Sequence, residues 1–109
     1  MSQGEFTRIA STSEIPDGGL HLTKLGNARI ALANVGGTIY AFDDECTHDG
    51  GPLSDGELHE CVVTCPWHFS SFDIRTGEIV DSPAEEPIGV YEVKVEGTEV
   101  FVGSRSEPS

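Results

Sequence analysis

Short stretches of apolar residues, many alternating with polar ones, run through most of the chain, and turn-forming residues separate them. Tyr91 to Glu96 alternates with a period of two, which indicates a strand with one buried face. Gly26-Asn27 and Gly36-Gly37 flank the apolar run Ala28 to Val35 and have the composition of tight turns. No stretch has the period of a long helix. The pattern predicts an all-β fold, an antiparallel β-sandwich or small barrel.

Individual elements follow from the same pattern. Phe6 to Ala10 is predicted to be the opening strand, and Ser11 with Glu14 provides a capping box for about one helical turn. Leu58 to Val63 is predicted to form one strand, and Thr98 to Val102 the last strand. The segment from Pro83 to Pro87 lacks strand character and is predicted to be a stiff loop.

The length of 109 residues fits one domain. The chain has no internal repeat and no segment with the composition of a linker, so we predict a single domain over residues 1–103. Residues 104–109 consist of Ser, Arg, Glu and Pro and are predicted to form a flexible tail.

The charge of the chain restricts its partners. Six basic residues stand against nineteen acidic ones, which gives a net charge of −13. Such a surface repels phosphate backbones and anionic lipids, so we expect no nucleic-acid partner and no membrane association. Basic patches on other proteins would be attracted, and encounter would be faster at low salt. Acidic composition that serves only solubility accounts for the charge equally well.

The cysteine count and the amino terminus indicate the compartment. Three cysteines are an odd number and define no disulfide framework. The residues Met1 to Glu5 are polar and have no apolar signal core, and no apolar run reaches the ~20 residues that span a bilayer. We therefore expect a soluble protein of the cytoplasm.

Two short motifs carry the chemistry of the chain, Cys46-Thr47-His48 and Cys65-Pro66-Trp67-His68. Each supplies one thiolate and one imidazole, and in each the cysteine comes first. Two matched halves on two loops can hold a two-iron cluster, with both cysteines on one iron and both histidines on the other. Two cysteines and two histidines also suit tetrahedral zinc, although the single residue between Cys46 and His48 is tight for one ion. Zinc therefore remains the alternative metal.

The ligand pattern resembles the Rieske [2Fe–2S] family, and the resemblance extends beyond the four ligands. Leu53-Ser54-x-Gly56 follows the first motif and Phe72-Asp73-x-x-Thr76-Gly77 follows the second, as they do in that family. The loop from Pro83 to Pro87 stands where the family has a third loop beside the cluster. The match covers roughly Phe6 to Val102. It implies a Rieske-like β-sandwich or barrel with a small cluster-binding subdomain, whose ligand loops lie within residues 43–73.

The resemblance is to the soluble Rieske ferredoxins of bacterial aromatic-ring dioxygenase systems. It implies one [2Fe–2S] cluster per chain, held by Cys46, His48, Cys65 and His68. It also implies an electron-transfer component of aromatic hydrocarbon catabolism, monomeric in isolation and not itself an enzyme. Its partners would be a flavoprotein NAD(P)H-ferredoxin reductase and a terminal Rieske oxygenase. Respiratory Rieske proteins have two further cysteines, whereas this chain has Gly51 and Trp67 at those positions.

Two other functions remain possible on the same fold. One is a relative of the small subunit of assimilatory nitrite reductase, which lacks the cluster ligands that this chain has. The other is a structural metal-binding module. Residues outside the motif have simpler roles: Cys61 is expected to pack as a small hydrophobe on a strand, with an alternative ligand role kept open, and His21 and His59 are expected to be solvated.

Three positions depart from the family pattern or bear on the potential. Phe69 stands where the family often has glycine, so the loop either avoids a left-handed backbone or is distorted by Phe69. Ser70 matches a hydrogen-bonding serine of high-potential relatives, whereas Phe72 replaces their tyrosine. Acidic residues near the ligands and the missing hydroxyl favour a low potential within the Rieske range. The acidic residues in question are Asp43, Asp44, Glu45 and Asp49.

Overall fold

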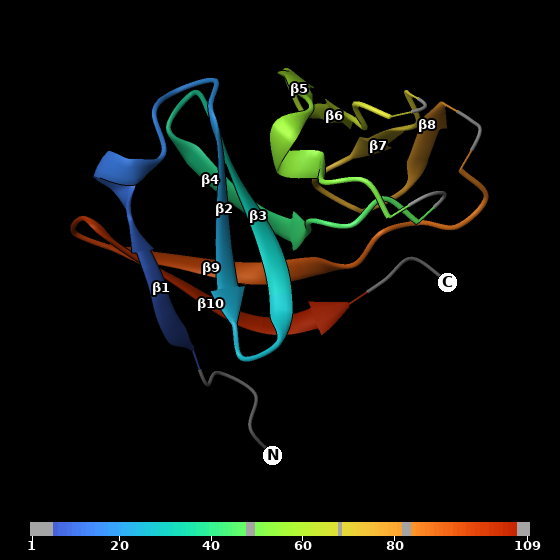
Figure 1. The fold of residues 1–109 in the computed structure, drawn as a ribbon. Helices are drawn as coiled ribbons and strands as arrows, with labels where there is room; N and C mark the ends of the chain where they lie inside the picture. Colours follow the sequence, from blue (N-terminus) through green and yellow to red (C-terminus); the bar gives the residue numbers. More distant parts are fainter. Residues whose placement is uncertain (1–5, 48–49, 68, 82–83, 107–109) are drawn as a thin grey trace.

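The computed structural model describes residues 6–47, 50–67, 69–81 and 84–106, which form almost entirely short strands (Figure 1). In chain order the elements are β1 Thr7–Ser11, η1 Thr12–Glu14, β2 Leu20–Leu25, β3 Ala28–Val35, β4 Thr38–Asp43, η2 Leu53–Asp55, β5 Glu57–His59, β6 Val62–Thr64, β7 Ser71–Asp73, β8 Ile79–Asp81, β9 Val90–Glu96 and β10 Glu99–Ser106. The two 3₁₀ turns are the only helices in this part of the chain. Neither they nor any other described segment forms a helix able to cross a bilayer.

The larger sheet is a nearly closed, barrel-like layer. Its strand order is β1-β10-β9-β4-β3-β2, and every pairing is antiparallel. The two edge strands, β1 and β2, lie close together: the Thr23 hydroxyl on β2 donates a hydrogen bond to the Ile9 carbonyl on β1 at 3.2 Å. The hairpin between β3 and β4 turns at Gly36-Gly37, where both residues have positive φ (62° and 96°), a conformation open to glycine. The predicted all-β fold is confirmed.

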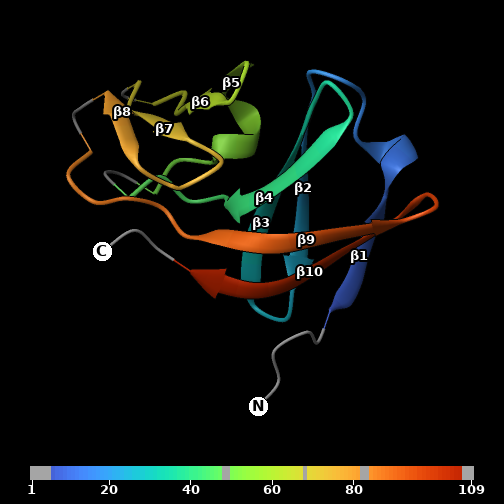
Figure 2. The ribbon, with the colours of Figure 1, turned by 180° about the vertical axis from the view of Figure 1, so that it is seen from behind.

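The smaller sheet is inserted between two neighbouring strands of the larger one. Its order is β5-β6-β7-β8, and it belongs to the chain between β4 and β9, which pair with each other. Both ribbon views show it as a separate layer at one end of the barrel (Figures 1 and 2). This is the small subdomain that the family resemblance implies, and it presents the loops that contain the two cysteine motifs.

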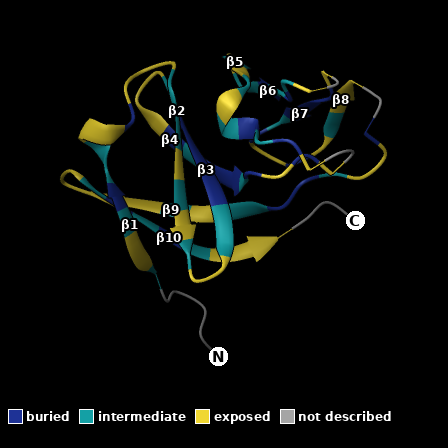
Figure 3. Ribbon diagram, viewed as in Figure 1, coloured by how far each residue is buried: buried dark blue, intermediate teal, exposed yellow. Residues whose placement is uncertain are grey.

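Two cores hold the layers together, and β3 faces both of them. Ile30 and Leu32 point into the barrel core, whereas Ala31 and Ala33 point to the other face of the sheet. The middle of β3 is therefore buried on both sides, which explains the continuous apolar run from Ile30 to Ala33 (Figure 3). The barrel core consists of Ala10, Ile15, Ile30, Leu32, Ile39, Ala41, Val100 and Val102. The second core, which we call the loop core, consists of Ala31, Ala33, Phe42, Cys46, Leu53, Val63, Cys65, Phe72, Ile74, Ala84 and Ile88.

Two details of the predicted elements were wrong. The stretch predicted as one strand from Leu58 to Val63 is a hairpin of β5 and β6, which turns at Glu60 and Cys61. Glu60 has a φ of 56°, a left-handed conformation that alternation of apolar residues does not reveal. The predicted boundary at residue 103 also falls inside a strand, because β10 continues to Ser106 and pairs there with β9. Residues 107–109 lie outside the described residues.

Candidate metal centre

Two of the four predicted ligands lie on separate loops and in the same core. Cys46 follows the end of β4, and Cys65 directly follows β6. Both are buried, with 3% and 0% of their surface exposed, and both belong to the loop core. His48 and His68 lie outside the described residues. The structure thus brings the cysteine half of the predicted set into one core, and the histidine half stays a prediction.

The donor set in this core fits an iron–sulfur centre. Buried thiolate sulfur with apolar neighbours is the typical ligand of such clusters, and two cysteines supply one iron of a Rieske centre. Among the described residues no three His, Cys, Asp or Glu side chains gather into a possible metal site. That result agrees with a set completed by His48 and His68, since both histidines lie outside the described residues.

The two cysteine loops have the same hydrogen-bond pattern. The Cys46 amide donates to the Gly51 carbonyl at 2.9 Å, and the Gly50 amide donates back to the Cys46 carbonyl at 2.8 Å. The Cys65 amide donates to the Ser70 carbonyl at 2.8 Å, and the Phe69 amide donates to the Cys65 carbonyl at 3.1 Å. In both loops the cysteine backbone therefore forms hydrogen bonds with the fourth and fifth residues after it. The described residues of the two halves therefore share one hydrogen-bond pattern, and the cysteine comes first in each half.

The matched pattern shows which backbone conformation position 69 requires. Gly50 and Phe69 occupy the same place in their loops, and both have a left-handed backbone, with φ of 76° and 68°. The second loop therefore uses the conformation that glycine favours, and Phe69 adopts it. A left-handed conformation costs a non-glycine residue roughly 1–2 kcal/mol. The ring gains little burial in return, because 69% of the Phe69 surface is exposed.

A third segment, residues 84–89, joins the two cysteine loops. The Thr47 hydroxyl beside Cys46 donates to the Glu86 carbonyl at 2.6 Å. The Ala84 amide donates to the hydroxyl oxygen of the buried Ser70 at 3.0 Å. Since Ala84 also belongs to the loop core, this segment closes the core from the side of the ligand loops. It includes the described part of the loop that the sequence predicted from Pro83 to Pro87.

Asp44 anchors the start of the first loop from inside the protein. Its side chain is fully buried and forms an ion pair with Arg29 on β3 at 2.8 Å. The other carboxylate oxygen accepts a hydrogen bond from the Ser54 amide at 2.7 Å, and the Asp44 carbonyl accepts one from the Leu53 amide at 2.6 Å. Asp44 thus ties β3 and η2 to the chain two residues before Cys46.

The charge environment differs from the one that the sequence suggested. Asp43 pairs with Arg105 at 2.5 Å, and Asp44 pairs with Arg29. Two of the four acidic residues that favoured a low potential are therefore compensated by arginines. Glu45 is exposed, and Asp49 lies outside the described residues. The low potential stays a prediction, and the structure weakens the charge argument for it.

The other residues that the sequence singled out differ in their burial and packing. Cys61 is partly buried in the β5–β6 turn and packs against the loop core, so it packs apolar surface as predicted but in a turn instead of a strand. His59 on β5 is exposed, as predicted, and His21 on β2 is partly buried. Phe72 is fully buried in the loop core. Sequence reasoning singled out neither Arg29 nor Arg105, because no local signal connects them to the acidic residues before Cys46.

Comparisons with known proteins identify the fold and the kind of centre. The model of the Rieske [2Fe–2S] domain family matches residues 5–101. The chain is 35% identical to the ferredoxin CarAc of Metapseudomonas resinovorans over 103 residues, which cover 94% of this chain and 96% of that protein. It is 37% identical to the biphenyl dioxygenase ferredoxin subunit of Pseudomonas sp. strain KKS102, with coverage of 89% and 90%.

A solved structure supports the same assignment. It is a complex of reduced oxygenase and oxidized ferredoxin in carbazole 1,9a-dioxygenase, and one chain in it matches with a TM-score of 0.82 and 36% identity. The match covers 89% of this chain and 91% of that one. These relatives are ferredoxins rather than catalytic components, as the sequence predicted.

Proposed function

The chain belongs to the Rieske [2Fe–2S] domain family, and on that premise we propose that it is a cytoplasmic ferredoxin of an aromatic-ring dioxygenase system. It takes single electrons from a flavoprotein NAD(P)H-ferredoxin reductase and passes them to a terminal Rieske oxygenase. It is a monomer in isolation. The observation that carries this proposal is the pair of matched cysteine loops on one core, in a chain that covers nearly the whole length of ferredoxin relatives.

The proposed ligands are Cys46 and Cys65 on one iron and His48 and His68 on the other. When bound, the [2Fe–2S] centre supplies reversible one-electron transfer, and no substrate bond is made or broken in the chain. The protein holds the two cysteines in an apolar core, and the paired loop hydrogen bonds fix their backbones. Segment 84–89 forms a hydrogen bond with each of the two cysteine loops. These contacts let the ligand frame stay in place while the charge of the centre changes.

The partners are inferred from the relatives and from the surface. The relatives named above are ferredoxin components of dioxygenase systems, and the solved complex contains an oxygenase with a ferredoxin. Two exposed aromatic residues flank position 68, with 56% of the Trp67 surface and 69% of the Phe69 surface accessible. We propose that they form the apolar centre of the docking surface. The net charge of −13 would steer the chain toward basic patches around the partner's redox centre.

A reconstituted electron-transfer assay tests this function. Reduction of the purified chain by NADH and a dioxygenase-system flavoprotein reductase is followed in a stopped-flow spectrometer. Electrostatic steering should make the second-order rate fall by about tenfold or more between low salt and 0.5 M salt. The isolated chain should convert no aromatic substrate. Oxygenase activity of the chain alone, or a failure to accept electrons from such a reductase at any salt concentration, would reject the proposed role.

Replacing Phe69 with glycine is expected to stabilise the protein and to impair docking. Glycine adopts the observed left-handed backbone without strain, so the free energy of unfolding should rise by about 1 kcal/mol. The exposed ring would be lost, and the rate of electron transfer to the oxygenase should fall. Denaturant unfolding and stopped-flow oxidation of the reduced chain measure the two effects.

Two variants separate backbone strain from the ring. Phe69→Ala keeps a left-handed residue with a Cβ but loses the ring, so the transfer rate should fall without the gain in stability. Gly50→Ala adds the same strain to the first loop, where an added Cβ would have no heavy atom within 4 Å. It should therefore destabilise the protein and leave the aromatic surface intact. An unchanged transfer rate in both Phe69 variants would show that the ring takes no part in docking.

A further inference from the structure

The last strand contains a β-bulge that determines where Arg105 points. Val102 of β10 pairs with Val93 of β9, but Arg105 pairs with Tyr91, so three steps along β10 correspond to two along β9. Because side chains alternate between the faces of a strand, the extra residue places Arg105 on the face that Tyr91 occupies. Without the bulge, Arg105 would lie on the opposite face.

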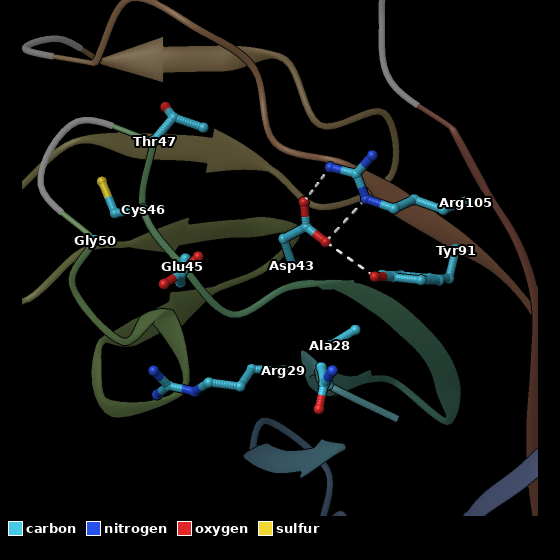
Figure 4. Close-up of a pocket in the computed structure, with 10 residues that line it drawn as sticks. Ala28, Arg29, Asp43, Glu45, Cys46, Thr47, Gly50, Tyr91 and Arg105 are labelled. Atoms are coloured by element: carbon cyan, nitrogen blue, oxygen red, sulfur yellow. Dashed lines mark hydrogen bonds and ion pairs between the residues drawn. The ribbon is translucent and has the colours of Figure 1, made fainter. Parts of the chain in front are cut away.

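On that face Arg105 meets Asp43, the last residue of β4. Its guanidinium makes a two-pronged contact with the Asp43 carboxylate, at 3.1 Å from Nε and 2.5 Å from the terminal nitrogen. The same carboxylate accepts hydrogen bonds from the Tyr91 hydroxyl at 3.1 Å and from the Gly89 amide at 3.1 Å. Figure 4 shows the arginine and the tyrosine converging on Asp43. Burial, then the negative charge of Asp43, raises the pKa of Tyr91 to about 12, so its hydroxyl remains a donor.

The guanidinium also lies close against the backbone beside Asp43. A Cβ added at Gly89 would come within 2.5 Å of the guanidinium of Arg105. The Asp43 amide donates to the Gly89 carbonyl at 2.9 Å, so the two segments are joined by backbone as well as by side chain. These contacts link the end of β4, the start of β9 and the end of β10 at one point.

That point lies three residues before Cys46 and on the same cavity. A pocket of about 610 Å³ is lined by Asp43, Tyr91 and Arg105 on one side and by Cys46 and Thr47 on another. The charges of the pair therefore lie near the proposed ligand. Asp43 is only 22% exposed at its side chain, and Arg105 42%, so water screens their field only in part.

We propose that Arg105 is a positioning residue for the [2Fe–2S] centre: through Asp43 it fixes the chain that leads into Cys46 and cancels a carboxylate charge beside that ligand. The inference rests on the proposed ligand role of Cys46. It assigns to the end of the chain a part in setting the properties of the centre. Loss of the Arg105 charge would disfavour the added electron, whereas loss of the Asp43 charge would favour it, because each change alters the net charge near the centre by one.

A charge cycle on the loaded protein tests the proposal. The variants Arg105→Gln, Asp43→Asn and their combination are prepared, and the midpoint potential is measured by voltammetry at low ionic strength. Arg105→Gln should lower the potential, Asp43→Asn should raise it, and the double variant should return near the unmodified value. Release of iron to a chelator should be several-fold faster in all three variants, because each loses the contact that fixes the first loop.

The other end of β10 supplies a matched control. Glu99, the first residue of β10, forms an ion pair there with Arg8 of β1. The start of β10 lies at the opposite end of the barrel from the small sheet in both views (Figures 1 and 2). Arg8→Gln and Glu99→Gln change the net charge by the same amounts and should leave the potential and iron release unchanged.

Two outcomes would overturn the proposal. If Arg105→Gln and Arg8→Gln shift the midpoint potential equally, the shift comes from the net charge of the protein and not from the Arg105–Asp43 pair. If Arg105→Gln and Asp43→Asn shift the midpoint potential in the same direction, distortion of the loop and not charge accounts for both shifts. Since these readouts need no partner protein, they are independent of the electron-transfer assay that tests the proposed function. Retention of iron in a Cys46→Ala variant would instead reject the ligand assignment itself.

Discussion

Replacing Cys65 with alanine is expected to yield a protein that contains no [2Fe–2S] centre. Cys65 is fully buried in the loop core, and no other cysteine belongs to the described part of its loop. One iron would lose one of its two protein ligands, and a Rieske centre needs both cysteines. Iron and acid-labile sulfide should fall from about two each per chain to near zero, together with the visible absorbance. Cys46→Ala, His48→Ala and His68→Ala should have the same effect.

Cys61→Ala is the matched control for this prediction. Cys61 lies in the β5–β6 turn and packs only partly against the loop core, so the variant should keep its iron and sulfide. Circular dichroism would show whether each variant keeps its β signal, which separates loss of ligand from loss of fold. Loss of iron from Cys61→Ala would contradict the assigned ligand set. Purified protein with one zinc and no sulfide would support the structural metal-binding module instead.

Replacing Arg29 with methionine is expected to destabilise the protein by about 2–3 kcal/mol. The Asp44 carboxylate is fully buried, and Arg29 is its cationic partner at 2.8 Å. Removal of one partner of a buried ion pair leaves a charge without compensation, which typically costs about 3–5 kcal/mol. We expect a cost below that range, about 2–3 kcal/mol, because 38% of the Arg29 side chain is exposed and water can screen that side. Denaturant unfolding of the iron-loaded protein measures the effect.

Combining Arg29→Met with Asp44→Asn tests the cause. Asparagine can still accept the hydrogen bond from the Ser54 amide but has no charge. If the uncompensated carboxylate is responsible, the double variant should be more stable than Arg29→Met alone. Arg75→Met is the control, because Arg75 pairs with the partly exposed Asp73 at 2.8 Å and should change stability by less than about 1 kcal/mol. Equal losses in Arg29→Met and in the double variant would point to lost packing of the arginine stem.

Local signals in the sequence were sufficient for most of the fold. The turns at Gly26-Asn27 and Gly36-Gly37 lie where predicted, because positive φ angles restrict the residues that can occupy them. The capping box is also present, with the Ser11 amide donating to the Glu14 carboxylate at 3.0 Å. The single strand predicted from Leu58 to Val63 failed at Glu60, since a left-handed glutamate leaves no pattern in the apolar residues.

The end of the chain shows where local composition misleads. Residues 104–106 have the composition of a polar tail, yet they form the end of β10. Arg105 pairs there with Tyr91 of β9, and its guanidinium contacts the Asp43 carboxylate. Polar residues at a strand end give no hydrophobic signal, and the stabilising contact comes from a residue 62 positions away. No short stretch of the sequence contains both Asp43 and Arg105.

The sequence by itself determined the β class, the family and its cofactor, because strand patterns, turns and the spacing of Cys46-x-His48 and Cys65-x-x-His68 are local properties of the chain. Only the tertiary structure decided the environment of the centre. It paired Asp43 and Asp44 with arginines from β10 and β3, gave the described residues of the two loops the same hydrogen bonds, and placed Phe69 in a left-handed backbone. Ion pairs and loop conformations of this kind depend on which distant segments meet, and that is fixed by the packing of the two sheets.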